Sequence, residues 1–408
     1  MSRPGIIVSV NKKAENLIKS GHPWVYAEEV ESIDSTYENG QLVDVVNSKG
    51  SWLGTGFVND NSKILVRLIS RNTNDKFDEA FWKRRLEYAI NYRKTVMGTD
   101  FPCSRLIFGE ADQFPGLTVD LFEDIIVTEV LSLGIENIKF MLYRLIVEIL
   151  KENYGINVRA IYERNESEIR LKEGMDKYKG FVEMEGLSNN LDGHILIKEN
   201  GISYDVDYIN GQKTGFFLDQ KYNRKAVAKL AKGKHALDCF THTGAFALNM
   251  ANGGAEHVTA VDISADAIAQ AKKNIYLNEF NDKIDVLQAD VFDFLTNLSL
   301  RKQKPFDLIV LDPPAFTKSN VTVKNAYRGY KEINMKAMKI LPRGGYLATC
   351  SCSHFMKAEM FREMLREAAK DASVSLRLIE ERKQSPDHPI LWGVPETEYL
   401  KFFIFQVV

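Results

Sequence analysis

Two cysteines near the C-terminus could act as nucleophiles. Cys350 and Cys352 follow an apolar run, 345–349, that has the pattern of a strand. A thiolate at the mouth of a sheet can add to carbon 6 of a cytosine, which makes carbon 5 able to take a methyl group from a sulfonium. A base must then remove the carbon 5 proton so that the thiolate can leave. Most free cysteines are only small buried hydrophobic residues, and this simpler role is favoured for Cys350 but not for Cys352.

An aspartate followed by two prolines ends another apolar run. Residues 306–311 lead into Asp312-Pro313-Pro314-Ala315-Phe316. The prolines fix the backbone and remove two N–H donors, so they stop the strand and leave carbonyls free to meet a ligand. A carboxylate near the ring could assist addition of a thiolate to a base, and a flat base could stack on Phe316. The alternative is a stiff loop with a packed phenylalanine, but the aspartate before the prolines favours the functional interpretation.

Three further aspartates stand at the ends of three successive predicted strands: Asp238, Asp262 and Asp290. In doubly wound sheets the ligand binds at the carboxyl ends of the strands. Asp262 could accept both hydroxyls of a ribose, and Asp290 could accept from the amino group of an adenine. Asp238 or Asp262 alone is as easily a solvated residue at a strand end. Three in succession favour a site for a nucleoside cofactor.

The loop that begins at Asp238 separates two kinds of cofactor. A dinucleotide enzyme needs G-x-G-x-x-G, so that the backbone can approach a pyrophosphate. The segment Asp238–Gly244 has one glycine and begins with a carboxylate, which would repel a pyrophosphate. A carboxylate suits a cationic sulfonium better, so S-adenosylmethionine (SAM) is favoured over a nicotinamide or flavin cofactor.

Strand-like and helical runs must position these residues, and they alternate from about residue 186 onward. This alternation predicts an α/β, Rossmann-like domain with a doubly wound, mostly parallel sheet. A final apolar run, 399–407, has no helix after it and is expected to add an antiparallel last strand. The predicted strands are 236–240, 258–262, 284–288, 306–311 and 345–349, and the predicted helices are 245–251, 265–277, 327–340 and 357–370.

Two smaller domains are predicted before residue 186. Residues 1–72 alternate short apolar runs with turn signals, as in a small β-rich domain. Residues 73–185 mix strands with helices at 77–97 and 138–152, as in a compact α+β domain. The predicted boundaries are therefore 1–72, 73–185 and 186–408.

Composition narrows the class of protein. A chain of 408 residues is too long for one ordinary core. The net charge is -2, and the three predicted domains carry net charges of 0, -5 and +3, so a surface that binds nucleic acid must be a local patch. The four cysteines lack the spacing of metal ligands and are expected to be free thiols, with no metal bound. No run is apolar enough to cross a bilayer and no signal peptide is recognised, which predicts a cytoplasmic protein with no membrane partner.

Over nearly its whole length the chain resembles the RlmI-type methyltransferases, which act on carbon 5 of cytosine in 23S ribosomal RNA. In that family a PUA domain and a small middle domain precede a Rossmann-like SAM methyltransferase domain. The order and spacing of six segments carry the resemblance: His22-Pro23-Trp24-Val25-Tyr26, Gly109-Glu110-Ala111-Asp112-Gln113-Phe114-Pro115-Gly116-Leu117, Lys213-Thr214-Gly215-Phe216-Phe217-Leu218-Asp219-Gln220, Asp312–Phe316, Arg328-Gly329-Tyr330-Lys331 and Ser351-Cys352-Ser353.

The resemblance implies roles for individual residues. Cys352 is expected to be the nucleophile and Asp312 to contact the target base. The residues expected to hold SAM are Phe216, Gln220, Asp238, Phe240, Thr241, Thr243, Gly244, Asp262, Ile263, Asp290 and Val291. Those expected to contact ribosomal RNA are Pro313, Pro314, Phe316, Lys318, Arg328, Lys12 and Lys13, although the two N-terminal lysines could equally belong to a solvated face. A second copy of the chain, forming a homodimer, is a further candidate partner.

One departure from the wider class of cytosine-C5 enzymes bears on product release. Many of them have a second cysteine after the proline pair, where this chain has Ala315. The RlmI-type group also lacks it, and the base that removes the carbon 5 proton is left open. Two other functions remain alternatives: methylation of a ring or exocyclic nitrogen of a purine, which needs no nucleophile, and a non-catalytic RNA-binding assembly factor.

Overall fold

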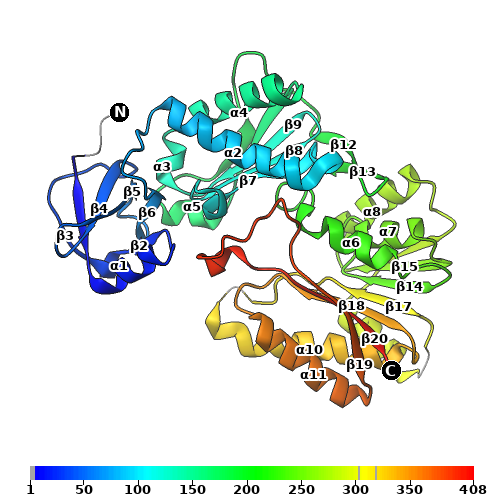
Figure 1. Ribbon diagram of the computed structural model, residues 1–408. Helices are drawn as coiled ribbons and strands as arrows, with labels where there is room; N and C mark the ends of the chain where they lie inside the picture. The colour runs from blue at the N-terminus through cyan, green and yellow to red at the C-terminus, as the bar shows by residue number, and fades with distance from the viewer. Residues whose placement is uncertain (1–4, 302–303, 318) are drawn as a thin grey trace. The chain divides into compact units, whose positions relative to one another are not determined.

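In this computed structural model, which describes residues 5–301, 304–317 and 319–408, the alternating strands and helices of the C-terminal region build one seven-stranded sheet (Figure 1). The strand order is β16-β15-β14-β17-β18-β20-β19. The first five strands pair in parallel, and β20 pairs antiparallel with both β18 and β19. The prediction of a doubly wound sheet with an antiparallel last strand is confirmed. The strands are β14 (His235–Cys239), β15 (His257–Asp262), β16 (Ile284–Gln288), β17 (Leu308–Leu311), β18 (Tyr346–Ser351), β19 (Leu376–Arg382) and β20 (Lys401–Val407).

Helices cover both faces of this sheet. Figure 1 shows α6, α7 and α8 on one face and α10 and α11 on the other. One hydrophobic core lies between the sheet and the second set of helices, where buried side chains of β14, β17 and β18 pack against those of α9, α10 and α11. The helices are α6 (Lys221–Ala228), α7 (Ala245–Asn252), α8 (Ala265–Leu277), α9 (Val291–Leu300), α10 (Val323–Ile340) and α11 (Ala358–Ala372).

The register of the parallel strands gathers their ends at one edge of the sheet. Cys239 in β14 lies opposite Val261 in β15 and Leu311 in β17, and Leu311 in turn lies opposite Thr349 in β18. Asp262 is the last residue of β15, and the loops after β17 and β18 carry Asp312 and Cys352. Parallel pairing therefore brings together residues that are up to 90 positions apart in the sequence.

The N-terminal region contains two smaller sheets. Six strands form a sheet with the order β2-β6-β5-β4-β1-β3, next to helix α1, and five form a sheet with the order β11-β10-β9-β8-β7, next to α2 and α4. The elements are β1 (Ile7–Val10), α1 (Lys12–Lys19), β2 (Trp24–Tyr26), β3 (Val30–Ile33), β4 (Leu42–Asn47), β5 (Trp52–Val58), β6 (Ile64–Ser70), α2 (Glu79–Met97), β7 (Cys103–Phe108), β8 (Leu117–Phe122), β9 (Ile125–Val130), α3 (Leu133–Glu136), α4 (Lys139–Tyr154), β10 (Ala160–Asn165), α5 (Glu168–Lys172) and β11 (Tyr178–Phe181). A two-stranded ribbon, β12 (His194–Glu199) and β13 (Ile202–Asp207), follows.

The chain folds into two units that are not continuous in sequence. Unit 1 comprises the residues up to Ile195 together with Val206–Leu218 and Pro386–Thr397, and unit 2 comprises Leu196–Asp205, Asp219–Ser385 and Glu398–Val408. Both small sheets belong to unit 1 and the large sheet belongs to unit 2. The boundaries 1–72, 73–185 and 186–408 stay a prediction. Among the described residues, no helix has both the length and the apolar character needed to span a lipid bilayer.

Candidate active site

The loop between β14 and α7 has an unusual backbone. Phe240 and His242 have φ angles of 63° and 50°, and Gly244 has 79°. The left-handed region costs a residue other than glycine of order 1 kcal/mol, so the surroundings must hold it. The Thr241 amide donates to the Val261 carbonyl at 3.0 Å, and the His242 amide donates to Asp262 Oδ2 at 2.9 Å. The loop is thus fastened to the end of β15.

Asp238 fastens the other side of the same loop. Its carboxylate is fully buried, and Oδ2 accepts from the Thr241 hydroxyl at 2.5 Å and from the Ala247 amide at 3.0 Å. Burial raises the pKa of Asp238 to about 7. Asp238 therefore holds the loop through Oδ2. Its buried Oδ1 makes no hydrogen bond within the described residues.

Two partly exposed carboxylates and an apolar side chain follow at the next strand ends. Asp262 accepts from the amides of His242 and Ser264, both at 2.9 Å, and the side chain of Ile263 is 63% exposed. Asp290 caps α9, and its Oδ1 accepts from the Phe292 amide at 2.7 Å. Its Oδ2 makes no hydrogen bond within the described residues. These acceptors beside an exposed apolar surface suit the hydroxyls, amino group and flat ring of a nucleoside.

Three other residues expected at the cofactor lie differently. Val291 is buried in the core of unit 2, so its side chain does not face solvent. Thr243 is also buried, and its carbonyl accepts from Asn274 Nδ2 at 3.0 Å. Phe216 is buried in unit 1.

Asp312 lies at the start of the proline loop and is oriented by two neighbours. Its Oδ1 accepts from the Cys350 thiol at 2.8 Å and from Gln220 Nε2 at 3.1 Å. Gln220 is itself held by Asn223, whose Nδ2 donates to Gln220 Oε1 at 2.7 Å. Burial raises the pKa of Asp312 to about 6, so it can hold a proton close to neutral pH. Asp312 is only partly exposed, and the hydrogen bonds from Cys350 and Gln220 fix the orientation of its carboxyl group.

The two cysteines of β18 and its following loop differ in access. Cys350 is fully buried, and its thiol is used as the donor to Asp312. Cys352 is partly exposed. Burial raises the pKa of the Cys352 thiol to about 12, with the carboxylates of Asp312 and Asp219 adding to the effect and the ammonium of Lys401 opposing it. Cys352 is therefore the accessible thiol of the two. The charges of Asp312, Asp219 and Lys401 influence its pKa.

Lys401 is a site residue that sequence reasoning missed. The antiparallel register pairs it with Ser351, next to Cys352. Its side chain is 7% exposed, and Nζ donates to the carbonyls of Ser353 and Tyr399, each at 2.7 Å. No carboxylate lies within 4 Å of Nζ among the described residues, and burial lowers its pKa to about 8. Within the described part of the chain, a buried ammonium with no carboxylate in contact thus stands beside the accessible thiol.

Asp219 was also missed, although it stands in a segment that the sequence singles out. Its Oδ2 accepts from the Tyr399 hydroxyl at 2.7 Å and its carbonyl accepts from the Ser385 amide at 2.8 Å. Its buried Oδ1 has no partner within the described part of the chain. The position of Asp219 directly before Gln220 was the one feature of the sequence that could have indicated a place in the site.

Phe316 packs within a group of aromatic rings. Its ring centroid lies 4.5 Å from that of Tyr330, 5.8 Å from Phe292 and 6.4 Å from Phe240. The Tyr330 hydroxyl lies 3.0 Å from the hydroxyls of both Ser351 and Ser353, which flank Cys352. The aromatic group therefore supports the loop that carries the accessible thiol.

The remaining residues predicted to contact RNA are scattered. Pro313 is buried, Pro314 and Arg328 are exposed, and Lys318 lies outside the described residues. In unit 1, Lys12 is paired with Glu15 at 2.9 Å and Lys13 with Glu29 at 2.9 Å. Both lysines are exposed, but neighbouring carboxylates already compensate their charge.

The chain is similar to known families and proteins. A family model described as PUA-like domain matches residues 8–71, and one described as S-adenosylmethionine-dependent methyltransferase matches residues 169–405. The chain is 37% identical to the ribosomal RNA large subunit methyltransferase I of Aliivibrio fischeri, over 99% of this chain and 100% of that protein. It is 38% identical to the protein of the same name from Pseudoalteromonas translucida, over 96% of each. A solved structure of a putative SAM-dependent methyltransferase from Streptococcus mutans shares the fold, with a TM-score of 0.81 and 21% identity over 98% of this chain and 100% of that one.

Proposed function

Because this chain belongs to the S-adenosylmethionine-dependent methyltransferases, within the family of ribosomal RNA large subunit methyltransferase I, we propose that it methylates carbon 5 of a cytosine in large-subunit ribosomal RNA. The reaction would pass through a covalent bond between Cys352 and carbon 6 of the base. The observation that carries this proposal is the partly exposed thiol of Cys352 beside Asp312 and Lys401.

The side chains at the carboxyl ends of β14, β15 and β16 suit the binding of SAM. The nucleoside would lie against Ile263, with its ribose hydroxyls on Asp262 and its adenine amino group on Asp290. Among the described residues Asp238 Oδ1 has no hydrogen-bond partner, and in its ionised form this buried carboxylate adds negative potential that favours a cation. SAM supplies a methyl group on a positively charged sulfur.

Three side chains would prepare the base for that methyl group. The Cys352 thiolate adds to carbon 6, and the neighbouring ammonium of Lys401 stabilises this thiolate against burial. Burial raises the pKa of Asp312 to about 6, so a minority of molecules hold a proton on this carboxyl group near neutral pH. Protonated Asp312 can donate to ring nitrogen 3, which makes carbon 6 more electrophilic and removes one of the negative charges that oppose the thiolate. After methyl transfer a base takes the carbon 5 proton, and the bond between sulfur and carbon 6 breaks.

Replacing Asp262 with alanine is expected to weaken SAM binding roughly 10- to 100-fold, the range for lost hydrogen bonds to a charged group. Isothermal titration calorimetry with SAM measures this change, and the thermal unfolding temperature checks that the loop survives. Asp285→Ala is the matched control, because Asp285 stands on β16 with a side chain that is 76% exposed. Unchanged affinity in both Asp262→Ala and Asp290→Ala proteins would contradict the placement of the nucleoside.

The identity of the methylated nucleoside tests the proposed function directly. Large-subunit RNA from cells that lack this protein is incubated with the purified protein and isotopically labelled SAM, then digested to nucleosides. We expect the label in 5-methylcytidine, measured by mass spectrometry. Label in a methylated guanosine or adenosine would instead indicate transfer to a purine. No label, with SAM still bound, would favour the assembly-factor alternative.

A further inference from the structure

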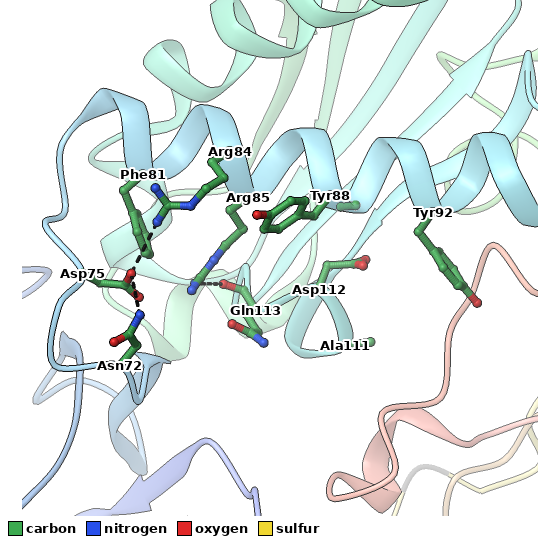
Figure 2. Close-up of a pocket in the computed structure, with 11 residues that line it drawn as sticks. Asn72, Asp75, Phe81, Arg84, Arg85, Tyr88, Tyr92, Ala111, Asp112 and Gln113 are labelled. Atoms are coloured by element: carbon green, nitrogen blue, oxygen red, sulfur yellow. Dashed lines mark hydrogen bonds and ion pairs between the residues drawn. The ribbon is translucent and has the colours of Figure 1, made fainter.

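A cavity of about 500 Å³ opens in unit 1 between helix α2 and the turn after β7 (Figure 2). Such a volume lies within the range of small-molecule sites, roughly 300–1,000 Å³. One wall is the exposed face of α2, and the other is part of the segment 109–117, which the sequence singles out but the proposed chemistry does not use.

Two tyrosines line the α2 side of this cavity. Tyr88 and Tyr92 are four residues apart and so lie on one face of the helix. The side chain of Tyr88 is 69% exposed and that of Tyr92 is 39% exposed. The Tyr92 hydroxyl donates to the Pro386 carbonyl at 3.1 Å, which fixes that ring, whereas Tyr88 makes no hydrogen bond within the described residues. An exposed ring beside a cavity offers a stacking surface for a flat ligand.

Among the described residues, one cation that lines the cavity has no carboxylate within 4 Å. Arg85 donates to the carbonyls of Ile69 and, at 3.1 Å, of Gln113, and its guanidinium lies 4.4 Å from the centre of the Phe81 ring. Among the described residues no carboxylate lies within 4 Å of it. Burial lowers the pKa of Arg85 to about 10, so it stays charged at neutral pH.

The acidic residues of the cavity are already neutralised. Asp75 pairs with Arg84 at 3.3 Å, and Asp112 makes a two-pronged contact with Arg93 at 2.5 and 2.7 Å. The positive charge of Arg85 therefore stands out in a segment, 73–185, whose net charge is -5. An anionic group on the ligand would supply the missing partner.

Gln113 adds a group that can recognise the edge of a ring. Its backbone is left-handed, with φ of 61°, and its amide donates to the Glu110 carbonyl at 3.1 Å, which holds the turn. The side chain of Gln113 is exposed, and its carboxamide group makes no hydrogen bond within the described residues. A free carboxamide is both donor and acceptor, as the edge of a base requires.

We propose that this cavity binds one unpaired nucleotide of single-stranded RNA, with the base on Tyr88, its edge at Gln113 and a phosphate at Arg85. Stacking rings, an arginine and a free amide are the means by which proteins bind unpaired bases. The inference rests on the proposed function, because it supplies a second contact with the RNA that the enzyme methylates. It assigns that contact to α2 of unit 1.

Fluorescence anisotropy with a labelled single-stranded oligoribonucleotide tests the assignment on the full chain. Tyr88→Ala is expected to weaken RNA binding about tenfold, in line with the loss of one base–aromatic contact. Tyr88→Trp should retain wild-type affinity, because it keeps a stacking ring. Tyr276→Ala, which removes a tyrosine that is 76% exposed on α8, is the matched control and should change little. In methyl transfer, Tyr88→Ala should raise the KM for RNA and leave kcat and the KM for SAM unchanged.

The outcomes separate this inference from the proposed function. Equal RNA affinity in wild type and the Tyr88→Ala protein overturns the cavity assignment and leaves the methyltransferase proposal standing. The same holds if the cavity binds only a free nucleotide or a phosphopeptide, with no effect of Tyr88→Ala on RNA. If wild type binds SAM but no RNA of any kind, the proposed function fails first.

Discussion

Replacing Cys352 with alanine is expected to lower methyl transfer at least about 10³-fold, because no other group can take over a covalent nucleophile. Without the sulfur, carbon 5 of a cytosine stays a poor nucleophile however well SAM and RNA are held. SAM affinity should be unchanged, since none of the acceptors at the nucleoside edge is altered. Transfer of labelled methyl groups to large-subunit RNA measures the loss.

A mechanism-based trap distinguishes this cause from a folding defect. RNA that carries 5-fluorocytidine has no proton at carbon 5 to remove, so the sulfur–carbon bond persists after methyl transfer. Wild type should form an adduct that survives denaturing electrophoresis, and Cys352→Ala should form none. Cys350→Ser is the matched control, because it keeps a donor to Asp312 at the neighbouring buried position and should still form the adduct. Full turnover by the Cys352→Ala protein would sink the covalent proposal and favour nitrogen methylation.

Asp312→Asn is expected to change two measurements in opposite directions. The Asp312 carboxylate raises the pKa of Cys352, so a neutral asparagine should lower that pKa and speed alkylation of the thiol by iodoacetamide at a fixed pH. Methyl transfer should nevertheless fall about 100-fold, the usual scale for loss of one group that donates or accepts a proton. Asparagine can still accept from Gln220 and Cys350, so the loop is expected to keep its shape. Mass spectrometry of the Cys352 peptide over a range of pH follows the first effect.

Lys401→Met is the matched variant, and it is expected to shift the pKa of Cys352 in the opposite direction. Its ammonium lowers the pKa of Cys352, so removing it should raise that pKa and shift the alkylation curve to higher pH. A variant that merely loosened the loop would speed alkylation at every pH instead. If both variants shift the curve in the same direction, the electrostatic account of Cys352 is wrong.

The fold of unit 2 could be predicted because its central strands are buried on both faces. β14, β17 and β18 are short, mostly apolar runs bounded by turns, a pattern typical of parallel sheets. One of the two edge strands lacked this signal: β19 carries charged residues among its exposed positions, and it was not predicted. Strand β20 was expected to close the sheet, yet it lies between β18 and β19.

Local sequence also predicted the site only in part. Asp312 and Gln220 were both named, and they share a hydrogen bond. Lys401 could not be found, because it comes 49 positions after Cys352 and is brought back only by the register of β20 on β18. A one-residue slip of that register would turn Lys401 to the opposite face of the sheet. Pairing between distant strands is the information that a single sequence does not contain.

The return of the segment Pro386–Thr397 to unit 1 has a consequence for how this chain is made. Arg93, fully buried in unit 1, donates to the Asp387 carbonyl at 3.0 Å, and the Asp387 carboxylate accepts from the Arg105 amide at 3.0 Å. Domains usually fold in order as they leave the translation machinery. Here the Arg93 guanidinium and the Arg105 amide lack these partners until Asp387, which follows most of unit 2 in the sequence, has been synthesised. We therefore expect unit 1 to complete its packing only after most of unit 2 has been translated.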